Sequence, residues 1–237
     1  MKHWVIPDIH GCYKTLRKLV EDQISPSKED TITFLGDYID RGPHSKKVID
    51  YVMMLQEEMS NINCLRGNHE EFMLQAYYKE VNRKWHYFYT GNPMLNLWKS
   101  VGGKQAMQSF RVSKVSDVPK KYIEWLENLK HYILTEKFVI VHAGLNFDID
   151  DPFSDLEAMT QIRNFEVVPE KIGNRRIIHG HVPLSIDFIK SNLENPESPF
   201  IALDNGCYHR TKPNLGSLTA LEINNLEIVS QVNIDII

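Results

Sequence analysis

Short apolar segments alternate with helical segments along this chain, and this alternation restricts the folds that it can adopt. Six runs have the length and the flanking residues of buried strands, namely HWVI, TITFL, INCL, KFVIV, RRIIH and FIAL. The segments YKTLRKLVED and SKKVIDYVMMLQEEM lie between the early runs, and their apolar residues recur with the period of an amphipathic helix. Strands that alternate with helices predict an α/β architecture.

Residues 71–132 depart from this alternation, because helical periodicity and aromatic residues dominate there. We expect a helical insertion at 71–132 within one domain that covers residues 1–237. Its aromatic residues are expected to pack within the insertion, or alternatively to form a cap that faces substrate; they are Phe72, Tyr77, Trp85, Trp98 and Trp125. The final segment, GSLTALEINNLEIVSQVNIDI, alternates apolar and polar residues, which predicts an antiparallel hairpin that turns at Asn224 and Asn225.

The composition is that of a soluble globular protein, with 42% hydrophobic and 24% charged residues. A formal net charge of -4 offers no basic field for a nucleic-acid backbone, so we expect no nucleic-acid partner. No apolar stretch is long enough to cross a membrane, and the first apolar run is too short for a signal peptide. We therefore expect a cytoplasmic protein without a membrane partner. Its three cysteines are expected to be reduced thiols, and a monomer is the default expectation because no heptad repeat occurs.

Polar side chains with metal-ligand chemistry follow five of the predicted strands. They are Asp8 and His10, then Asp37, Asp40 and Arg41, then Asn68, His69 and Glu70, then His142, and finally His179 and His181. Each group alone has an ordinary structural explanation, such as an Asp that caps a turn, or GNHE as the start of a helix. Because the carboxyl ends of strands line the binding crevice in open α/β sheets, the five groups together predict one common site.

The chemistry of these side chains indicates bound cations. Carboxylates that are buried close together cannot stay ionised unless positive charge compensates them. Their mixture with imidazole suits Mn, Fe or Zn better than an all-oxygen Ca site. At least six candidate ligands are too many for one ion. The sequence therefore predicts two divalent ions about 3.5–4 Å apart, with a carboxylate such as that of Asp37 able to bridge them.

Five motifs, DIHG, GDYIDRG, RGNHE, VHAG and HGHVP, occur in this order between Asp8 and about Gly206. Together they resemble the metal-dependent Ser/Thr phosphoprotein phosphatases of the calcineurin-like metallophosphoesterase superfamily, especially the compact bacterial and phage members. The resemblance implies an α/β sandwich of two mixed β-sheets flanked by helices, with a helical insertion. It also implies a metal-dependent phosphomonoesterase that acts on a phosphoprotein or a small phosphoester.

The resemblance also implies roles for single residues. Asp8, His10 and Asp37 would hold the first metal ion, and Asp37, Asn68, His142 and His181 the second. Manganese is the first expectation, and iron or zinc suit the same ligands. His179 is expected to pack beside the site, and Asp204 to support it structurally.

The implied catalytic residues are His69, Asp40, Arg41 and Arg163. A hydroxide that bridges the metals would attack phosphorus, and His69 would act as general acid with Asp40 orienting its imidazole. Arg41, Arg163 and Asn68 would bind the substrate phosphate, with a surface salt bridge as the less favoured alternative for Arg163.

Two other functions stay open at this point. A symmetrical bis(5'-nucleosyl)-tetraphosphatase, which hydrolyses diadenosine tetraphosphate, resembles the same set of motifs. A metal-binding or regulatory protein that kept the fold and lost catalysis is the alternative from another class, and it is disfavoured because His69, Asp40 and the arginines accompany the metal ligands.

Overall fold

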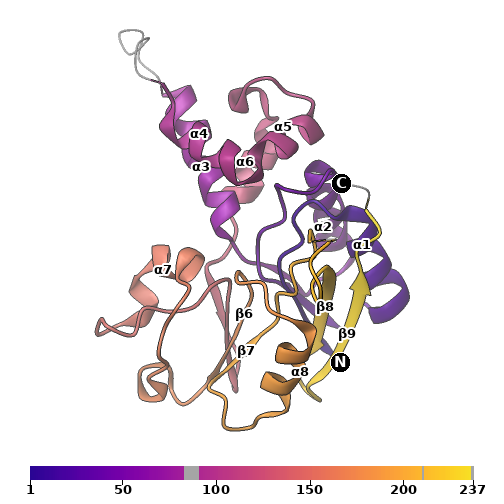
Figure 1. Cartoon of the computed structure of the whole chain (residues 1–237), viewed down its shortest axis with the longest axis vertical. Coiled ribbons are helices and arrows are strands. Elements are labelled where there is room, and N and C mark those ends of the chain that lie inside the picture. The colour runs from indigo at the N-terminus through magenta and orange to yellow at the C-terminus, as the bar shows by residue number, and fades with distance from the viewer. Residues whose placement is uncertain (83–90, 210, 236–237) are drawn as a thin grey trace.

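The computed structural model describes residues 1–82, 91–209 and 211–235. Two β-sheets form the centre, and helices cover their outer faces (Figure 1). The strands are β1 (His3–Ile6), β2 (Thr31–Phe34), β3 (Ile62–Cys64), β4 (Tyr132–Leu134), β5 (Phe138–Val141), β6 (Arg176–His179), β7 (Phe200–Ala202), β8 (Ser217–Glu222) and β9 (Glu227–Val232).

The α-helices are α1 (Tyr13–Lys18), α2 (Ser45–Glu58), α3 (Asn68–Val81), α4 (Pro93–Trp98), α5 (Lys104–Phe110), α6 (Lys120–Glu127), α7 (Leu156–Gln161) and α8 (Ile186–Glu194). Two π-helical segments, η1 (Leu19–Ile24) and η3 (Lys99–Gly103), continue α1 and α4, and the short 3-10 turns are η4 (Val115–Asp117), η5 (Pro152–Ser154) and η6 (Pro169–Ile172).

Both sheets are mixed, as the family resemblance implies. The first has the order β3-β2-β1-β8-β9, in which β1, β2 and β3 are parallel and the β8–β9 hairpin is antiparallel to them. The second has the order β4-β5-β6-β7, with β5, β6 and β7 parallel and β4 antiparallel at the edge. The predicted hairpin is confirmed, with Glu222 paired to Glu227 across the turn. The edge strand β4 lies at the end of the region 71–132, where the sequence indicated only helix.

Alternation along the strands builds three apolar clusters. Val5 of β1 faces Ile140 of β5 and Ile178 of β6 between the sheets, so this cluster holds the two layers together. Trp4 and Ile6 point to the opposite face of the first sheet, where α1 and α2 cover them. Because successive side chains of a strand point to opposite faces, a strand that is covered on both sides reads as a continuous apolar run.

Helices α3, α4, α5 and α6 stand together above the sheets (Figure 1). Four of the five aromatic residues singled out in this region pack against the first core cluster, namely Phe72, Tyr77, Trp98 and Trp125. The packing prediction is therefore confirmed for these four, whereas Trp85 lies outside the described residues. Helix α3 begins at Asn68, three residues before the expected start of the helical region.

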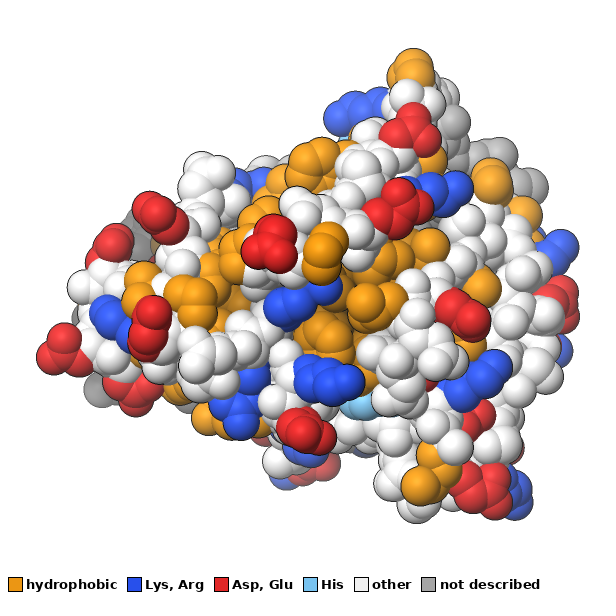
Figure 2. Space-filling view, turned by 90° about the horizontal axis from the view of Figure 1, so that it is seen from below, with side chains coloured by type: hydrophobic (Ala, Val, Ile, Leu, Met, Phe, Trp, Pro, Cys, Tyr) orange, Lys and Arg blue, Asp and Glu red, His pale blue; other side chains and the backbone are white. Residues whose placement is uncertain are grey.

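The two ends of the sheets differ in character. Seen from below, the molecule presents apolar side chains with both basic and acidic side chains among and around them (Figure 2). A cavity of about 620 Å³ beside α8 is lined by Arg176, Lys190, Leu193 and Leu226, among others. Arg176 begins β6 and His179 ends it, so this cavity lies at the opposite end of the strand from the polar cluster.

Among the helices of the described residues, none combines the length and apolar character needed to span a bilayer.

Candidate active site

The polar side chains that follow the parallel strands meet at one end of the two sheets. His142, after β5, lies 3.2 Å from His181 and 3.3 Å from Asn68, measured from its Nε2 to their Nδ1 and Oδ1. The backbone N–H of His181 donates to Oδ1 of Asp8 at 3.0 Å. Residues from both sheets thus form one buried group, because the carboxyl ends of their parallel strands point to the same edge.

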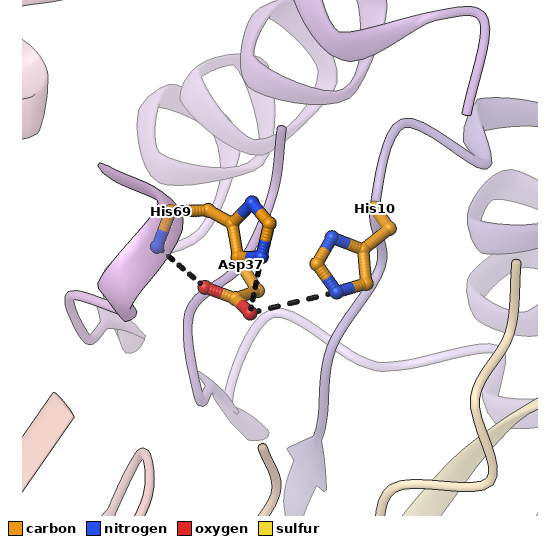
Figure 3. A group of neighbouring side chains, drawn as sticks. All are labelled: His10, Asp37 and His69. Atoms are coloured by element: carbon orange, nitrogen blue, oxygen red, sulfur yellow. Dashed lines mark hydrogen bonds and ion pairs between the residues drawn. The ribbon is translucent and has the colours of Figure 1, made fainter. Parts of the chain in front are cut away.

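Asp37 lies at the centre of this group. Its Oδ2 is 3.5 Å from Nε2 of His10 and 3.9 Å from Nε2 of His69, and its Oδ1 is 3.7 Å from Nε2 of His142. Figure 3 shows the imidazoles of His10 and His69 next to each other, both directed toward the Asp37 carboxylate. Two sets of possible metal ligands share this residue, His10 with His69 on one side and His142 with His181 on the other.

The tautomers of two imidazoles direct lone pairs into the site. Nδ1 of His10 lies 3.0 Å from the carbonyl oxygen of Ile39, and Nδ1 of His142 lies 3.1 Å from that of Leu35. A carbonyl oxygen can only accept, so each Nδ1 carries the proton, and in the neutral ring Nε2 is the nitrogen with the lone pair. Histidines that bind metal ions commonly donate one ring N–H to a carbonyl or carboxylate oxygen in this way and ligate the ion through the other nitrogen.

Several hydrogen-bond acceptors face one another in the site, and this arrangement suits cations. Nε2 of His142 faces Oδ1 of Asn68 and Oδ1 of Asp37, and all three atoms are acceptors in these assignments. Among the described residues, buried Oδ2 of Asp8 and Nε2 of His181 have no hydrogen-bond partner. Buried acceptors without donors are costly unless a cation satisfies them, so the residues present fit a metal centre.

Asp40 and His69 form a tight pair beside this cluster. Nδ1 of His69 lies 2.6 Å from Oδ2 of Asp40, and both side chains are almost fully buried. The indole N–H of Trp98 also donates to this carboxylate, at 2.8 Å to Oδ2 and 3.1 Å to Oδ1. With its Nδ1 proton directed to Asp40, the His69 ring presents Nε2 to the site.

The two arginines differ in their surroundings. Arg41 donates from Nη1 to Nε2 of His10 at 2.8 Å and from Nη2 to Nε2 of His69 at 3.0 Å, and its guanidinium stacks 4.3 Å from the ring centre of Tyr208. Arg163 follows α7 and is exposed, and within the described residues it makes no ion pair, so the salt bridge considered for it is absent there. Its positive charge contributes to lowering the pKa of His181, after the larger effect of burial.

Burial favours the neutral form of the His10 and His69 imidazoles by lowering the pKa of each. It lowers the pKa of His10 well below the ordinary value, and the neighbouring Arg41 lowers this pKa further. Burial lowers the pKa of His69 to about 4, and the Asp37 carboxylate opposes that shift. Burial raises the pKa of Asp40, whereas the hydrogen bond from Trp98 opposes the rise by favouring the carboxylate. Neutral imidazoles at pH 7 have the lone pairs that metal ligation requires.

The turns that carry these residues have unusual backbone conformations. His10, Asp37, Asp40, Arg41 and His181 have φ values of 47°, 50°, 73°, 61° and 68°. Such left-handed conformations cost side-chain-bearing residues about 1–2 kcal/mol each, so surrounding interactions must hold them. One such interaction comes from η3, where the carbonyl oxygen of Gly102 accepts the backbone N–H of Arg41 at 3.4 Å.

The family comparison fits this arrangement. A family model described as calcineurin-like phosphoesterase matches residues 1–229 of the 237. The chain belongs to the calcineurin-like phosphoesterase family. The symmetrical bis(5'-nucleosyl)-tetraphosphatase of Wigglesworthia glossinidia brevipalpis is 28% identical over 157 residues, which are 64% of this chain and 48% of that protein. The serine/threonine-protein phosphatase 1 of Salmonella typhimurium is 35% identical over 82 residues, which are 35% of this chain and 36% of that protein.

The chain therefore spans less than half the length of these two relatives. A solved structure of a protein serine/threonine phosphatase from Saccharomyces cerevisiae has a TM-score of 0.64 and 16% identity, and it covers 100% of this chain and 81% of that one. At this identity the likeness concerns the calcineurin-like fold, including its two mixed sheets.

Three residues contact the site residues in ways that the sequence analysis did not predict. Glu70, which the sequence placed among the strand-end polar residues and at the start of a helix, accepts the backbone N–H groups of Gly67 and of the turn at Asp37. Trp98 was considered only as a packing or cap residue, and Tyr208 was not considered. The glycine pair Gly102-Gly103 is a signal in the sequence that a close backbone approach occurs near Trp98.

Other residues behave as expected. His179 packs between Phe165 and Phe200, with ring centres at 5.5 and 5.4 Å, and its Nδ1 donates to the carbonyl oxygen of Gly180. Asp204 is buried, and its Oδ1 accepts the backbone N–H of Gly206 at 2.7 Å, which stabilises the turn after β7.

Proposed function

We propose that this chain is a metal-dependent phosphomonoesterase that resembles Ser/Thr protein phosphatases. The observation that carries the proposal is the position of Asp37 between two groups of possible metal ligands, one of which includes His69, with the Arg41 guanidinium hydrogen-bonded to that imidazole. A metal cluster, a cation that can bind phosphate and an imidazole for proton transfer are the parts that phosphoester hydrolysis needs. All of them lie at the same edge of the sheets.

The metal ligands follow from the buried acceptors. We assign Asp8, His10 and Asp37 to one divalent ion, and Asp37, Asn68, His142 and His181 to the other. Mn is the first choice, and Fe or Zn suit the same oxygen and nitrogen ligands. When bound, the ions supply Lewis acidity toward the phosphoryl oxygens and lower the pKa of water so that it can act as a nucleophile.

Arg41 and Arg163 would bind the substrate phosphate, together with the amide of Asn68. The Arg41 guanidinium has two N–H groups directed into the site, a geometry that suits two phosphate oxygens. Because the Nε2 lone pair of His10 accepts one partner, Arg41 would release this nitrogen if His10 held a metal ion. Arg163, exposed and near His181, would reach the phosphate from the side of α7.

His69 would protonate the departing oxygen. Asp40 holds Nδ1 of His69 at 2.6 Å, so Nε2 is the nitrogen that faces substrate. The acid form requires a proton at Nε2; burial opposes this protonation by lowering the pKa of His69, and the Asp37 carboxylate favours it. Arg41 must leave Nε2 before this nitrogen can donate, and phosphate binding by Arg41 provides the reason for it to leave.

A symmetrical bis(5'-nucleosyl)-tetraphosphatase is the second candidate. It is favoured by the relative of that name, which aligns with 157 residues of this chain, whereas the serine/threonine phosphatase aligns with 82. Both reactions break a bond between phosphorus and oxygen, so the strand-end residues would serve either one.

A substrate panel separates the candidates. The protein would be loaded with Mn, Fe or Zn in turn and assayed with a phosphoserine peptide and with diadenosine tetraphosphate. We expect phosphate release from the peptide at the higher kcat/KM. Release of ADP at a far higher kcat/KM would assign the tetraphosphatase activity instead.

The His69→Asn variant tests catalysis itself. If His69 is the acid, kcat with the better substrate falls by about 10²-fold or more while the metal content stays at the wild-type level. Wild-type protein that binds metal and hydrolyses neither substrate would support the alternative of a metal-binding protein without catalysis.

A further inference from the structure

Trp98 connects the helical region above the sheets to the Asp40–His69 pair. Its side chain is fully buried at the end of α4, and its indole N–H lies 2.8 and 3.1 Å from the two oxygens of Asp40. Indole nitrogen is a donor only, so the direction of this bond is fixed whatever the tautomer of His69. The bond therefore links the insertion to a side chain that we place in the catalytic machinery.

Trp98 is one of the two side chains that donate to the Asp40 carboxylate in the described residues. In the described residues its hydrogen-bond donors are the ring of His69 and the indole of Trp98, and the carboxylate is completely buried. His69 reaches only Oδ2, whereas Trp98 is the donor that reaches Oδ1. Without the indole N–H, Oδ1 would be a buried acceptor without a donor, and the carboxylate would be free to rotate.

The segment after Trp98 holds the indole in place. A Cβ on Gly103 would lie 2.5 Å from Cδ2 of the Trp98 ring, so only glycine permits this approach. A Cβ on Gly102 would lie 2.7 Å from the backbone nitrogen of Arg41, and Gly102 has a φ of 126°. Because the two glycines have no side chain, the indole and the backbone of η3 can pack closely against the turn that carries Asp40 and Arg41.

We propose that Trp98 is a positioning residue for proton transfer by His69, acting through the Asp40 carboxylate. The helical insertion then completes the catalytic machinery, in addition to its packing role. This inference rests on the proposed function of His69 as the acid. A carboxylate fixed at both oxygens holds the imidazole in one orientation, and misplacing a proton donor by a fraction of its hydrogen-bond length costs rate without weakening substrate binding.

The test is the Trp98→Phe variant, which keeps an aromatic ring and removes the N–H. Two substrates distinguish positioning from packing: p-nitrophenyl phosphate, whose leaving group departs as a stable anion, and a phosphoserine peptide, whose alkoxide needs a proton. We expect kcat on the peptide to fall by about 10- to 100-fold. We expect KM for both substrates, kcat on p-nitrophenyl phosphate and inhibition by inorganic phosphate to stay near wild type.

Trp125→Phe is the matched control. The indole N–H of Trp125 donates to Oε1 of Gln56 at 2.8 Å on the exposed side of α6, so this variant also loses one indole hydrogen bond. It should leave both activities unchanged. An Asp40→Asn background gives the second control, because Trp98→Phe should have little further effect on the peptide there if it acts through Asp40.

The outcomes separate this inference from the proposed function. If His69→Asn loses activity selectively on the peptide and Trp98→Phe does not, the inference on Trp98 is wrong and the acid role stands. An equal loss on both substrates in Trp98→Phe would mean that Trp98 only packs. If His69→Asn loses no activity, both the acid role and the inference fail.

Gly103→Ala provides a second variant if Trp98→Phe does not fold. The added methyl group must displace the indole while leaving its N–H chemistry intact. We expect the same selective loss on the peptide, with metal content and the urea midpoint as independent readouts. Unchanged peptide turnover in a folded Gly103→Ala protein would contradict the inference.

Discussion

The carboxylate of Glu70 accepts the backbone N–H of Asp37 at 2.8 Å, and this bond ties the start of α3 to the turn that follows β2. The same carboxylate accepts the N–H groups of Tyr38, Ile39 and Gly67 at 2.9, 3.4 and 3.0 Å. Both oxygens therefore accept two donors each. The left-handed conformation of Asp37 is held by a buried side chain thirty-three residues away in the sequence.

Replacing Glu70 by Gln tests this arrangement. A Gln side chain offers one acceptor oxygen and places an NH₂ group against backbone donors, so two N–H groups lose their partner. We expect the free energy of unfolding in urea to fall by about 1.5–3 kcal/mol. Glu71→Gln is the control, because Glu71 is partly exposed and its side-chain partners among the described residues are Arg66 and Gln75; its effect should be about 0–1 kcal/mol. Equal effects of the two variants would contradict a special role for Glu70.

Asp37→Asn should reduce metal binding. The variant keeps the shape of the side chain and removes the negative charge that both proposed ion sites share. Elemental analysis after dialysis should give about two ions per wild-type chain and clearly fewer in the variant. Asp50→Asn, at a surface pair with Lys46, should keep the wild-type metal content. Full loading of the Asp37→Asn protein would remove Asp37 from its bridging position.

Arg163→Ala should weaken phosphate recognition without affecting stability. The side chain is exposed and has no ion-pair partner in the described residues, so its removal should leave the urea midpoint unchanged. We expect kcat/KM to fall by about 10- to 100-fold, which corresponds to losing about 1.5–3 kcal/mol of charge-assisted hydrogen bonding in the transition state. Arg17→Ala, in an exposed pair with Glu21, is the control and should not change kcat/KM. If both variants keep the wild-type kcat/KM, Arg163 does not bind substrate.

Acid should destabilise the chelator-treated protein through its buried imidazoles, and His179 gives a clear case. Burial lowers the pKa of His179 to about 4 in the folded protein, whereas the unfolded chain has the ordinary value of 6.5. Between these values the unfolded state binds the extra proton, so stability is complete above pH 6.5 and falls as the pH drops toward 4.

Urea unfolding between pH 7.5 and pH 4 measures this dependence. His179→Phe keeps a ring between Phe165 and Phe200 but cannot be protonated. Its free energy of unfolding should therefore fall less steeply with decreasing pH than that of the wild type, by up to about 1.4 kcal/mol per pH unit. Identical slopes would show that His179 titrates in the same way in both states.

The sequence by itself determined much of the framework. Apolar runs bounded by turn residues predicted β1, β2, β3, β5, β6 and β7, because a strand buried on both faces needs apolar residues throughout. The motifs at their ends also identified the residues that the fold brings together, since parallel strands direct their carboxyl ends to one edge. The family followed from the same motifs and agrees with the family model.

Only the tertiary structure decided which side chains complete the site. The indole of Trp98 reaches Asp40 across fifty-eight positions, and Glu70 holds the backbone of Asp37 across thirty-three. No local sequence pattern predicts either contact, because each depends on how α3 and α4 pack against the turn after β2. Apolar pattern and spacing predict elements and the edge where they meet, whereas hydrogen bonds between distant segments are fixed only when the packed helices and turns set the distances between them.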